Sequence, residues 1–300
     1  MQESRPATSA KMAMARSRSL WLGVAVAAGS LFLAASGAPA GETPKRVVSM
    51  NVCTDQMAML IAAAGQLHSV SYLATDPATS VLADEARHFV VNHGQAEEIF
   101  LMQPDLVLAG SYTTRATVGL LRQLGIRVEE FQPENSFNDV RAGLRRMGDI
   151  LDRRERAETL VSELDRKLAE VKKQSHPNIT VATYYANSYT SGAGTLIDAV
   201  VAASGLTNLA TKLGLTGTQQ LPLELLVMAK PDMLVDSEAH YTTPALAQQT
   251  FIHPAYRTLA QETGRVSVPA KYTICGAPFT AIAVEMLTQA AANHAGDVRP

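Results

Sequence analysis

The sequence predicts an α/β protein with two similar lobes, one long helix joining them and a ligand cleft between the lobes. On both sides of the middle of the chain, short apolar or β-branched runs alternate with helical runs, which is the pattern of parallel α/β units. The segment Glu155–Gln174 places apolar residues at three- and four-residue steps and is otherwise almost wholly charged, so we expect one amphipathic helix there. A similar acidic segment stands on each side of this helix, which favours two similar, Rossmann-like lobes over the alternative, an ordinary surface helix inside a single α/β domain.

Residues 1–40 have the composition of a secretory signal peptide. Basic residues precede an apolar run over residues 20–35, and residues 38–40 read Ala-Pro-Ala, a small-residue cleavage pattern. We expect cleavage after Ala40 in preference to an uncleaved membrane anchor, because the apolar run is short and no basic flank follows it. No cysteine ends the run, so a periplasmic protein without a lipid anchor is expected.

The composition is that of a globular protein with two medium domains. Of its 300 residues, 47% are hydrophobic and 18% are charged. We expect lobes over residues 41–135 and 177–300, with a connecting helical segment over residues 136–176. Residues 1–40 hold four basic residues and one acidic residue, so the mature chain is mildly acidic. It has no basic stripe, so we expect it to bind neither nucleic acid nor anionic lipid. We also expect a monomer.

The first lobe is expected to alternate strands and helices. The strands are expected at residues 45–50, 69–73, 88–91, 106–109 and 127–131, and the helices near residues 57–64, 96–102 and 114–124. Polar loops follow three of the strands, at residues 51–55, 92–95 and 111–114. Because α/β sheets bind ligands at the carboxyl ends of their strands, these loops are candidates for a cleft wall. Helix N-capping is the more ordinary role for Thr54 or Asp55 taken alone.

The second lobe offers an aromatic counterpart. A strand is expected at residues 179–185 and a helix at residues 196–203, entered through a Gly192–Thr195 turn, with a last strand at residues 266–268. The loop over residues 184–189 contains three tyrosines, and further candidate loops lie at residues 237–241 and 271–276. Aromatic rings with hydroxyl groups suit a large flat ligand or a metal chelate. We expect only one or two of the three tyrosines to contact it.

An acidic signature occurs once in each lobe. Glu97 stands seven residues before Pro104, and Glu224 stands seven residues before Pro231. Each segment is predicted to form a short helix, a Pro-Asp turn and an apolar strand, and the turn alone explains the proline and the aspartate. A glutamate at a helix start gains about 0.3–1 kcal/mol from the helix dipole, which would account for either acid singly. The matched pair indicates two equivalent exposed charges for a two-fold partner.

Residues 45 to about 290 resemble the periplasmic substrate-binding proteins of ABC importers for vitamin B12, iron siderophores and haem, the class with a single helical connector. The resemblance rests on RVVSMN, the two acidic segments with QPDLVLA and KPDMLV, LLRQLGIRV, FNDVRAGLRRMGDIL and HPAYRTLAQETGRVSV. It implies that Glu97 and Glu224 dock on arginines of a homodimeric permease, which works with its ATPase. Glu98 is second choice for the first position, because it lacks the seven-residue register.

The resemblance also implies a transported ligand, an iron chelate or a corrinoid, and no intrinsic cofactor. We favour an iron chelate over a corrinoid because the only tryptophan, Trp21, lies in the predicted signal peptide. Only Arg115 and Lys271 offer nearby positive charge for an anionic chelate. The candidate cleft residues share a position near a predicted strand end and are Asn51, Cys53, Tyr72, His93, Tyr112, Arg115, Tyr185, Asn187, His240, Tyr241, Lys271 and Tyr272.

The two cysteines, Cys53 and Cys275, are the only ones in the chain. An even pair in an oxidising compartment suggests one disulfide. In the resembling family the equivalent loops line the cleft from opposite sides, which implies that the two residues can meet there. A disulfide, two free thiols and thiol ligation of a metal ion remain open at this point.

Other functional classes receive less support. The sequence has no GxSxG elbow, no P-loop and no metallohydrolase histidine pair, so an enzyme is not expected. A binder of a bare transition-metal ion needs several converging histidines and carboxylates, whereas the seven histidines here are scattered. This binder, and a periplasmic sensor or adaptor on the same fold, stay as alternatives.

Overall fold

The computed structural model describes residues 42–173, 179–236 and 246–297. The predicted signal peptide with its cleavage point, and the cleft candidates His240 and Tyr241, lie outside these residues. Among the helices that the structure describes, none is both long enough and apolar enough to cross a membrane.

A five-stranded parallel sheet forms the first lobe, with the strand order β3-β2-β1-β4-β5. The order reverses at β1, since the chain first builds β2 and β3 on one side of it and then β4 and β5 on the other. Such a switch point opens a crevice at the carboxyl ends of the strands. The central strands β1 and β4 are wholly buried, which explains their apolar sequences. The strand bounds are β1 Val47–Ser49, β2 Leu67–Ser71, β3 Val90–Asn92, β4 Leu106–Gly110 and β5 Val128–Phe131.

Helix α1 (Val52–Ile61) begins directly after β1, which corrects the expectation of a loop over residues 51–55 and a helix from residue 57. Asn51 is the N-cap, because the backbone N–H of Cys53 donates to its Oδ1 at 3.0 Å. Thr54 and Asp55, considered as caps, are buried in the first turn instead. The other helical segments of this lobe are η1 Tyr72–Thr75, α2 Ala83–Ala86, α3 Ala96–Leu101 and α4 Arg115–Gln123.

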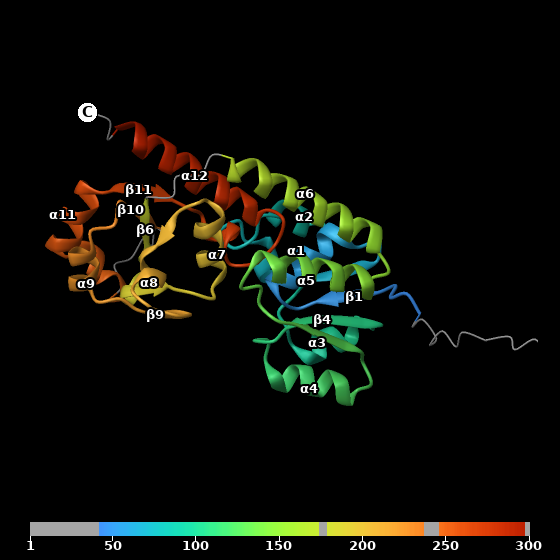
Figure 1. The fold of residues 1–300 in the computed structure, drawn as a ribbon. Coiled ribbons are helices and arrows are strands. Elements are labelled where there is room, and N and C mark those ends of the chain that lie inside the picture. The colour runs from blue at the N-terminus through green and yellow to red at the C-terminus, as the bar shows by residue number, and fades with distance from the viewer. Residues whose placement is uncertain (1–41, 174–178, 237–245, 298–300) are drawn as a thin grey trace, which may run out of the picture. The chain divides into compact units, whose positions relative to one another are not determined.

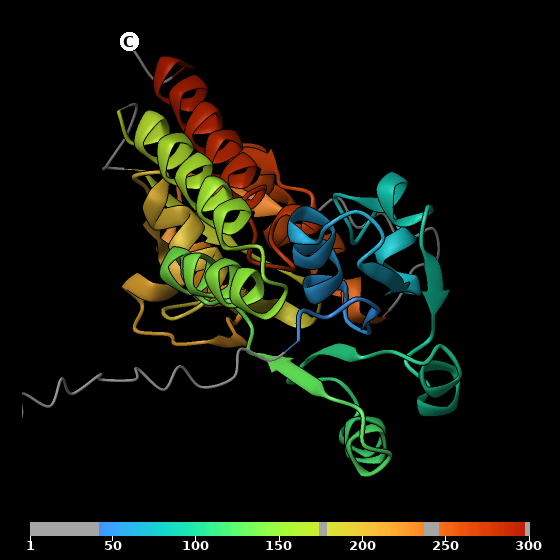
Figure 2. The ribbon, with the colours of Figure 1, turned by 90° about the vertical axis from the view of Figure 1, so that its right-hand side faces the viewer.

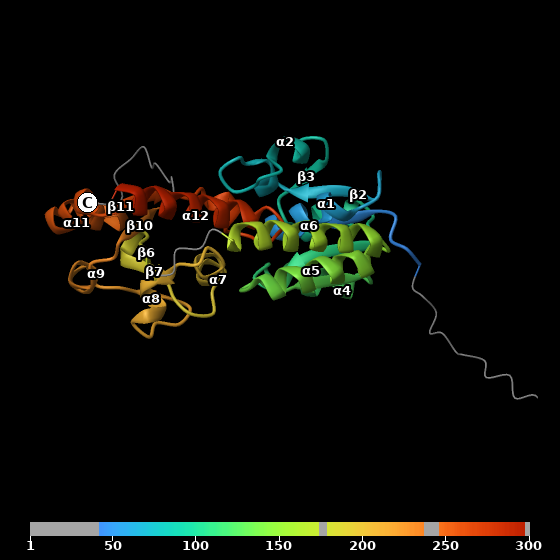
Figure 3. The same cartoon turned by 45° about the horizontal axis from the view of Figure 1, so that its top comes forward.

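Two helices follow the first sheet, α5 (Phe137–Ile150) and α6 (Arg154–Lys172), and they lie side by side in Figure 3. Their close approach requires Gly148, because a Cβ at that position would stand 2.5 Å from the Cβ of Ala157. Helix α6 agrees with the predicted amphipathic helix, and its buried residues are Ala157, Leu160, Val161, Leu164 and Val171.

The C-terminal helix α12 (Thr280–Asp297) packs against one end of α6, as Figures 1 and 2 show. One continuous apolar cluster includes Val47 of β1, Leu144 of α5, Leu164 of α6, Val181 of the second sheet and Ala291 of α12. The connecting helix is therefore supported along its length by packing against both halves of the chain.

The second lobe contains a four-stranded parallel sheet, with the order β11-β10-β6-β8. A separate antiparallel pair, β7 with β9, had not been predicted. Helix α7 has the predicted bounds, and the backbone N–H of Asp198 donates to the Thr195 hydroxyl at its start. The elements are β6 Thr180–Thr183, η2 Ala186–Ser188, β7 Tyr189–Ser191, α7 Leu196–Ala203, β8 Thr207–Asn208, α8 Leu209–Lys212, β9 Thr218–Gln220, α9 Leu223–Ala229, β10 Met233–Asp236, η3 Leu246–Gln248, α10 Gln249–Ile252, α11 Pro254–Glu262, β11 Gly264–Ser267 and η4 Ala270–Tyr272. The predicted α/β fold class is confirmed.

The two Pro-Asp turns have the same structure. Asp105 accepts the backbone N–H of Lys45 at 2.6 Å and that of Arg46 at 3.0 Å, just before β1. Asp232 accepts the backbone N–H of Thr180 at 2.7 Å, at the start of β6. Asp105, just before β4, thus holds the start of β1 beside β4, and Asp232, just before β10, holds the start of β6 beside β10. This role goes beyond the turn preference that the sequence suggested.

Candidate functional site

A pocket of about 250 Å³ lies at the carboxyl ends of β1, β4 and β5, where the strand order of the first sheet reverses. Gly110 at the end of β4 permits the approach of the Asn51 side chain, because a Cβ at position 110 would stand 2.9 Å from the side-chain nitrogen Nδ2 of Asn51. The polar, aromatic and cysteine residues of the wall are Asn51, Cys53, Thr54, Ser111, Tyr112, Phe131, Gln132 and Glu134. Three of the predicted cleft residues are therefore brought together here.

Exposed aromatic rings stand at the same edge of the first sheet. Tyr112, in the loop after β4, is 88% exposed, and Tyr72, directly after β2, is 50% exposed. The Tyr72 ring stacks on His93 after β3, with centroids 5.6 Å apart and ring planes 17° apart. The backbone N–H of His93 donates to Glu98 at 2.8 Å, so Glu98, the second choice for docking, holds this loop in place.

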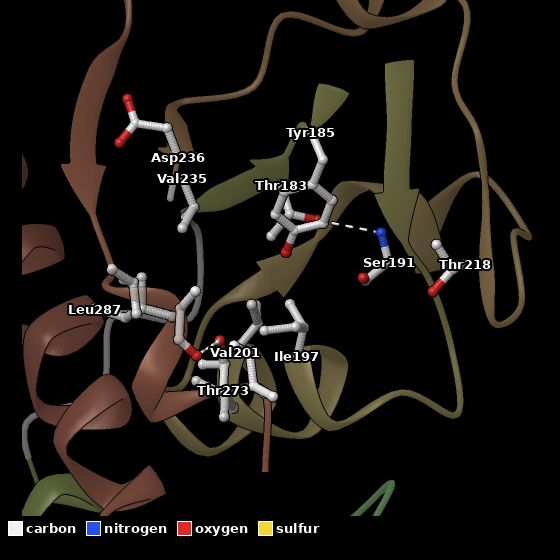
Figure 4. A pocket seen from close by; sticks show the side chains of 14 residues that line it. Thr183, Tyr185, Ser191, Ile197, Val201, Thr218, Val235, Asp236, Thr273 and Leu287 are labelled. Carbon is white, nitrogen blue, oxygen red and sulfur yellow. Dashed lines mark hydrogen bonds between the residues drawn. The ribbon is translucent and has the colours of Figure 1, made fainter. Parts of the chain in front are cut away.

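A second pocket, of about 340 Å³, lies at the carboxyl ends of β6, β10 and β11 (Figure 4). Its wall combines hydroxyl groups with aliphatic side chains. The hydroxyl-bearing residues are Thr183, Tyr185, Ser191, Thr218 and Thr273, and the aliphatic ones include Ile197, Val201, Val235 and Leu287. The backbone N–H of Ser191 donates to the Thr183 hydroxyl at 3.3 Å, which joins β7 to the end of β6.

The three tyrosines of the loop after β6 have different surroundings. Tyr184 is 1% exposed and stacks on Tyr256 in the core, whereas Tyr189 is exposed. Tyr185 lines the second pocket, and Figure 4 shows its ring extending toward Ile197. Burial raises the pKa of the Tyr185 phenol, so its hydroxyl stays protonated at neutral pH and offers a hydrogen-bond donor.

A disulfide bond joins Cys53 to Cys275 where the two pockets meet. The two Cα atoms are 5.1 Å apart, and the residues are 222 positions apart in sequence. Ile274, next to Cys275, lines both pockets. Of the three states left open for the cysteines, the structure shows the disulfide. The first lobe and the loop after β11 are thus covalently joined beside the candidate ligand site.

Glu134 lines the first pocket and was missed by the sequence analysis. It is only 7% exposed, and Gly276 packs so closely that a Cβ there would stand 2.3 Å from the Cβ of Glu134. Burial raises the pKa of Glu134 to about 7, against the opposing effect of hydrogen bonds from its own backbone N–H and that of Gly276. Its position could have identified it, because Glu134 lies in the loop after β5 and ligands bind at the carboxyl ends of parallel strands.

Asp55 is a second buried acid near the disulfide. It is 0% exposed, and its Oδ2 accepts the backbone N–H and the hydroxyl of Ser71, while Oδ1 is buried without a hydrogen-bond partner in the structure. Burial raises its pKa to about 7, although the hydrogen bonds act in the opposite direction. The acid is therefore largely protonated below neutral pH.

The raised pKa of Glu134 predicts a pH-dependent stability. Between pH 4.5 and about 7 the carboxyl group is protonated in the folded protein and ionised in the unfolded chain, so the free energy of unfolding falls as the pH rises. We expect Glu134→Gln to remove roughly 3 kcal/mol of this fall, measured by urea unfolding from pH 4.5 to pH 8. Glu163→Gln, at an exposed position of α6, should leave the profile unchanged, and an E134Q profile parallel to the wild type would contradict the assignment.

Four further predicted residues, Arg115, Asn187, Lys271 and Tyr272, do not line either of the two pockets. Arg115 is the first residue of α4 and is exposed, and Asn187 is exposed in η2 with a positive φ of 56°. Lys271 and Tyr272 belong to η4, with the ammonium group 5.5 Å from the tyrosine ring centroid. Their neighbours Ala270 and Thr273 line the second pocket. Across residues 42–173, 179–236 and 246–297, no three or more His, Cys, Asp or Glu side chains are grouped to hold a metal ion.

The chain is similar to known proteins over most of its length. A family model described as periplasmic binding protein matches residues 47–268. The chain is 25% identical over 248 residues to the cobalamin-binding protein of Halobacterium salinarum. That match covers 76% of this chain and 66% of the archaeal protein, slightly under two thirds of its length.

Solved structures share the fold at low sequence identity. The periplasmic haem-binding protein RhuT of Roseiflexus is 21% identical with a TM-score of 0.67, over 84% of this chain and 99% of that chain. The periplasmic vitamin B12 binding protein BtuF of Vibrio cholerae is 18% identical with a TM-score of 0.63, over 84% of this chain and 98% of that chain. At these identities the likeness concerns the fold.

Proposed function

Because the chain belongs to the periplasmic binding protein family, we propose that it is the substrate-binding component of an ABC importer and captures a metal chelate in the periplasm. The observation that carries the proposal is the pair of pockets at the carboxyl ends of two parallel sheets, which meet at Ile274. In parallel α/β folds this edge is where ligands bind. The predicted signal peptide would deliver the protein to this compartment.

The chemistry of the two pocket walls supports a large chelate as the ligand. Exposed rings of Tyr72, His93 and Tyr112 stand on the first-lobe side, and hydroxyl and aliphatic groups stand on the second-lobe side. Rings with polar edges bind flat ligands by stacking and orient them by hydrogen bonds. The similar proteins named above bind cobalamin and haem, which are both ring-shaped metal chelates. We favour an iron chelate, a siderophore or haem, over a corrinoid.

Delivery to the importer is proposed to use Glu97 and Glu224. Each is the second residue of its helix, α3 or α9, and each is exposed. The partner is a homodimeric permease with its ATPase, which offers each acid an equivalent cationic site. The packing of α12 against α6 and the disulfide at the pockets support a small closure of the lobes around the ligand.

Ligand titration tests the proposed substrate class. Native mass spectrometry of protein purified from periplasm is expected to reveal a bound chelate. Calorimetric titration of the emptied protein with a ferric hydroxamate, haem and cyanocobalamin should give micromolar or tighter binding for one of them. Tyr112→Ala and Tyr185→Ala should each weaken this binding roughly tenfold, because each removes ring contact and a hydroxyl group.

Tyr189→Ala provides the control, since this exposed tyrosine belongs to the antiparallel pair β7 and β9. It should bind the chelate as the wild type does. A protein that binds none of the three chelates would contradict the proposal, and so would a protein that carries only a bare metal ion in the native mass spectrum.

A further inference from the structure

Helices α3 and α9 match each other beyond the two acids. Leu101 follows Glu97 by four residues, and Met228 follows Glu224 by four residues. Leu101 is 80% exposed and Met228 is 76% exposed, so both lobes place a large apolar side chain in solvent at the same helix position. Scattered single apolar residues are normal on protein surfaces. Here, however, an exposed apolar residue follows the docking acid by four positions in both lobes, which scattered exposure does not explain.

Each apolar side chain shares a helix face with its acid. Residues four positions apart on an α-helix are surface neighbours, so the carboxylate and the apolar side chain form one patch in each lobe. The rotation of each helix is fixed from the other side by one wholly buried residue, Ile99 in α3 and Leu226 in α9, both 0% exposed. The patch must therefore face outward in both lobes.

The ends of the two helices are also alike. Gln103 and Lys230 follow the helices with positive φ angles of 51° and 44°, and a proline comes next in both cases. Non-glycine residues rarely adopt this conformation, so its occurrence at both positions shows that the same helix ending is built twice. The apolar residue just before this ending has the same backbone setting in each lobe.

We propose that Leu101 and Met228 are apolar anchors of the docking surface, each entering an apolar hollow beside a cationic side chain on one subunit of a homodimeric membrane permease. This inference rests on the proposed function. The carboxylates select a partner with positive charge, and the internal repetition selects a partner with two equivalent sites. Burying these side chains removes apolar surface from water, which supplies the affinity that rim charges alone do not.

The two anchors differ in which neighbour adds apolar surface. Next to Leu101, Phe100 is 47% exposed and joins Pro104 and Ile126 in lining a shallow groove. The corresponding residue in α9 is Val227, which is partly buried against the second-lobe core. Leu225, three positions before Met228, is also 47% exposed, so each anchor has one further exposed apolar neighbour on its own helix, and the loss of either anchor should weaken docking to a similar extent.

Docking is measured as the affinity of the ligand-loaded protein for the permease–ATPase complex of the same organism in lipid nanodiscs. We expect Leu101→Ser and Met228→Ser to weaken binding roughly tenfold each, and the double variant roughly a hundredfold. Affinity for the chelate should not change. The matched control is Leu120→Ser/Leu213→Ser, which removes one exposed leucine from each lobe, at 40% and 44% exposure, outside α3 and α9.

The outcomes separate this inference from the proposed function. If the double variant docks like the wild type while charge reversal at Glu97 and Glu224 abolishes docking, the apolar anchors are wrong and the docking acids stand. If charge reversal is also without effect, the proposed docking role of Glu97 and Glu224 fails and the anchors fail with it, whereas the proposed binding of a chelate is tested separately by titration. An equal loss in the Leu120/Leu213 control would overturn the anchors as well.

Discussion

Charge reversal at both docking acids, Glu97→Lys with Glu224→Lys, is expected to abolish uptake of the chelate while its affinity for the protein stays unchanged. Both side chains are exposed at helix starts, so the variant should fold normally. The proposed sites on the permease are cationic, so they would attract the two glutamates and repel the two lysines. We expect a loss of more than a hundredfold in docking affinity, measured on the reconstituted permease complex.

The control for net charge is Glu85→Lys with Glu163→Lys, which makes the same change at two other exposed acids. This variant should transport normally. Each single reversal should give an intermediate loss that becomes smaller at high salt, because exposed charges are screened. Wild-type uptake by the double E97K/E224K variant, with the chelate bound as before, would remove the docking role from both residues.

Removal of the disulfide is expected to cost about 2–4 kcal/mol of the free energy of unfolding. The bond closes a loop of 222 residues, so it restricts nearly the whole unfolded chain. Alanine is the better replacement for both cysteines, because Cys275 is 1% exposed and a serine hydroxyl would be buried there. Urea unfolding of Cys53→Ala/Cys275→Ala against the wild type measures the loss.

Reduction of the wild-type protein distinguishes the effect of the disulfide bond on stability from the effect of replacing the two side chains. Dithiothreitol should shift the unfolding midpoint of the wild type toward that of the double alanine variant and leave the variant itself unchanged. Equal midpoints for oxidised wild type and variant would show that the link contributes nothing to stability.

Helix caps and apolar stripes predicted the elements whose structure depends mainly on their own residues. Helix α7 has the predicted bounds because a capping threonine precedes a run in which Asp198 is the one polar residue, and α6 follows its apolar stripe. The start of α1 was misplaced because Asn51, Thr54 and Asp55 read as a polar loop, whereas Asp55 is buried and accepts the backbone N–H of Ser71 in β2. Strands β7 and β9 were missed because both are short and polar, and only their pairing makes them strands.

The candidate site was predicted in part for the same reason. The rule that ligands bind at the carboxyl ends of parallel strands located Asn51, Tyr112 and Tyr185 near the pockets. The contacts between distant segments could not be read from the sequence. The stacking of Tyr72 on His93 follows from the pairing of β2 with β3, and the burial of Glu134 follows from the close approach of Gly276.

The bond between Cys53 and Cys275 also changes how the protein responds to proteases. A single cut of the backbone anywhere between the two cysteines leaves two fragments that are still one covalent molecule. Both halves of the candidate site lie almost entirely within this closed loop, so a nicked chain keeps its two pocket walls together as long as the cysteines stay oxidised. In a compartment that contains proteases but keeps cysteines oxidised, one bond thus protects the pairing of the two lobes against backbone damage.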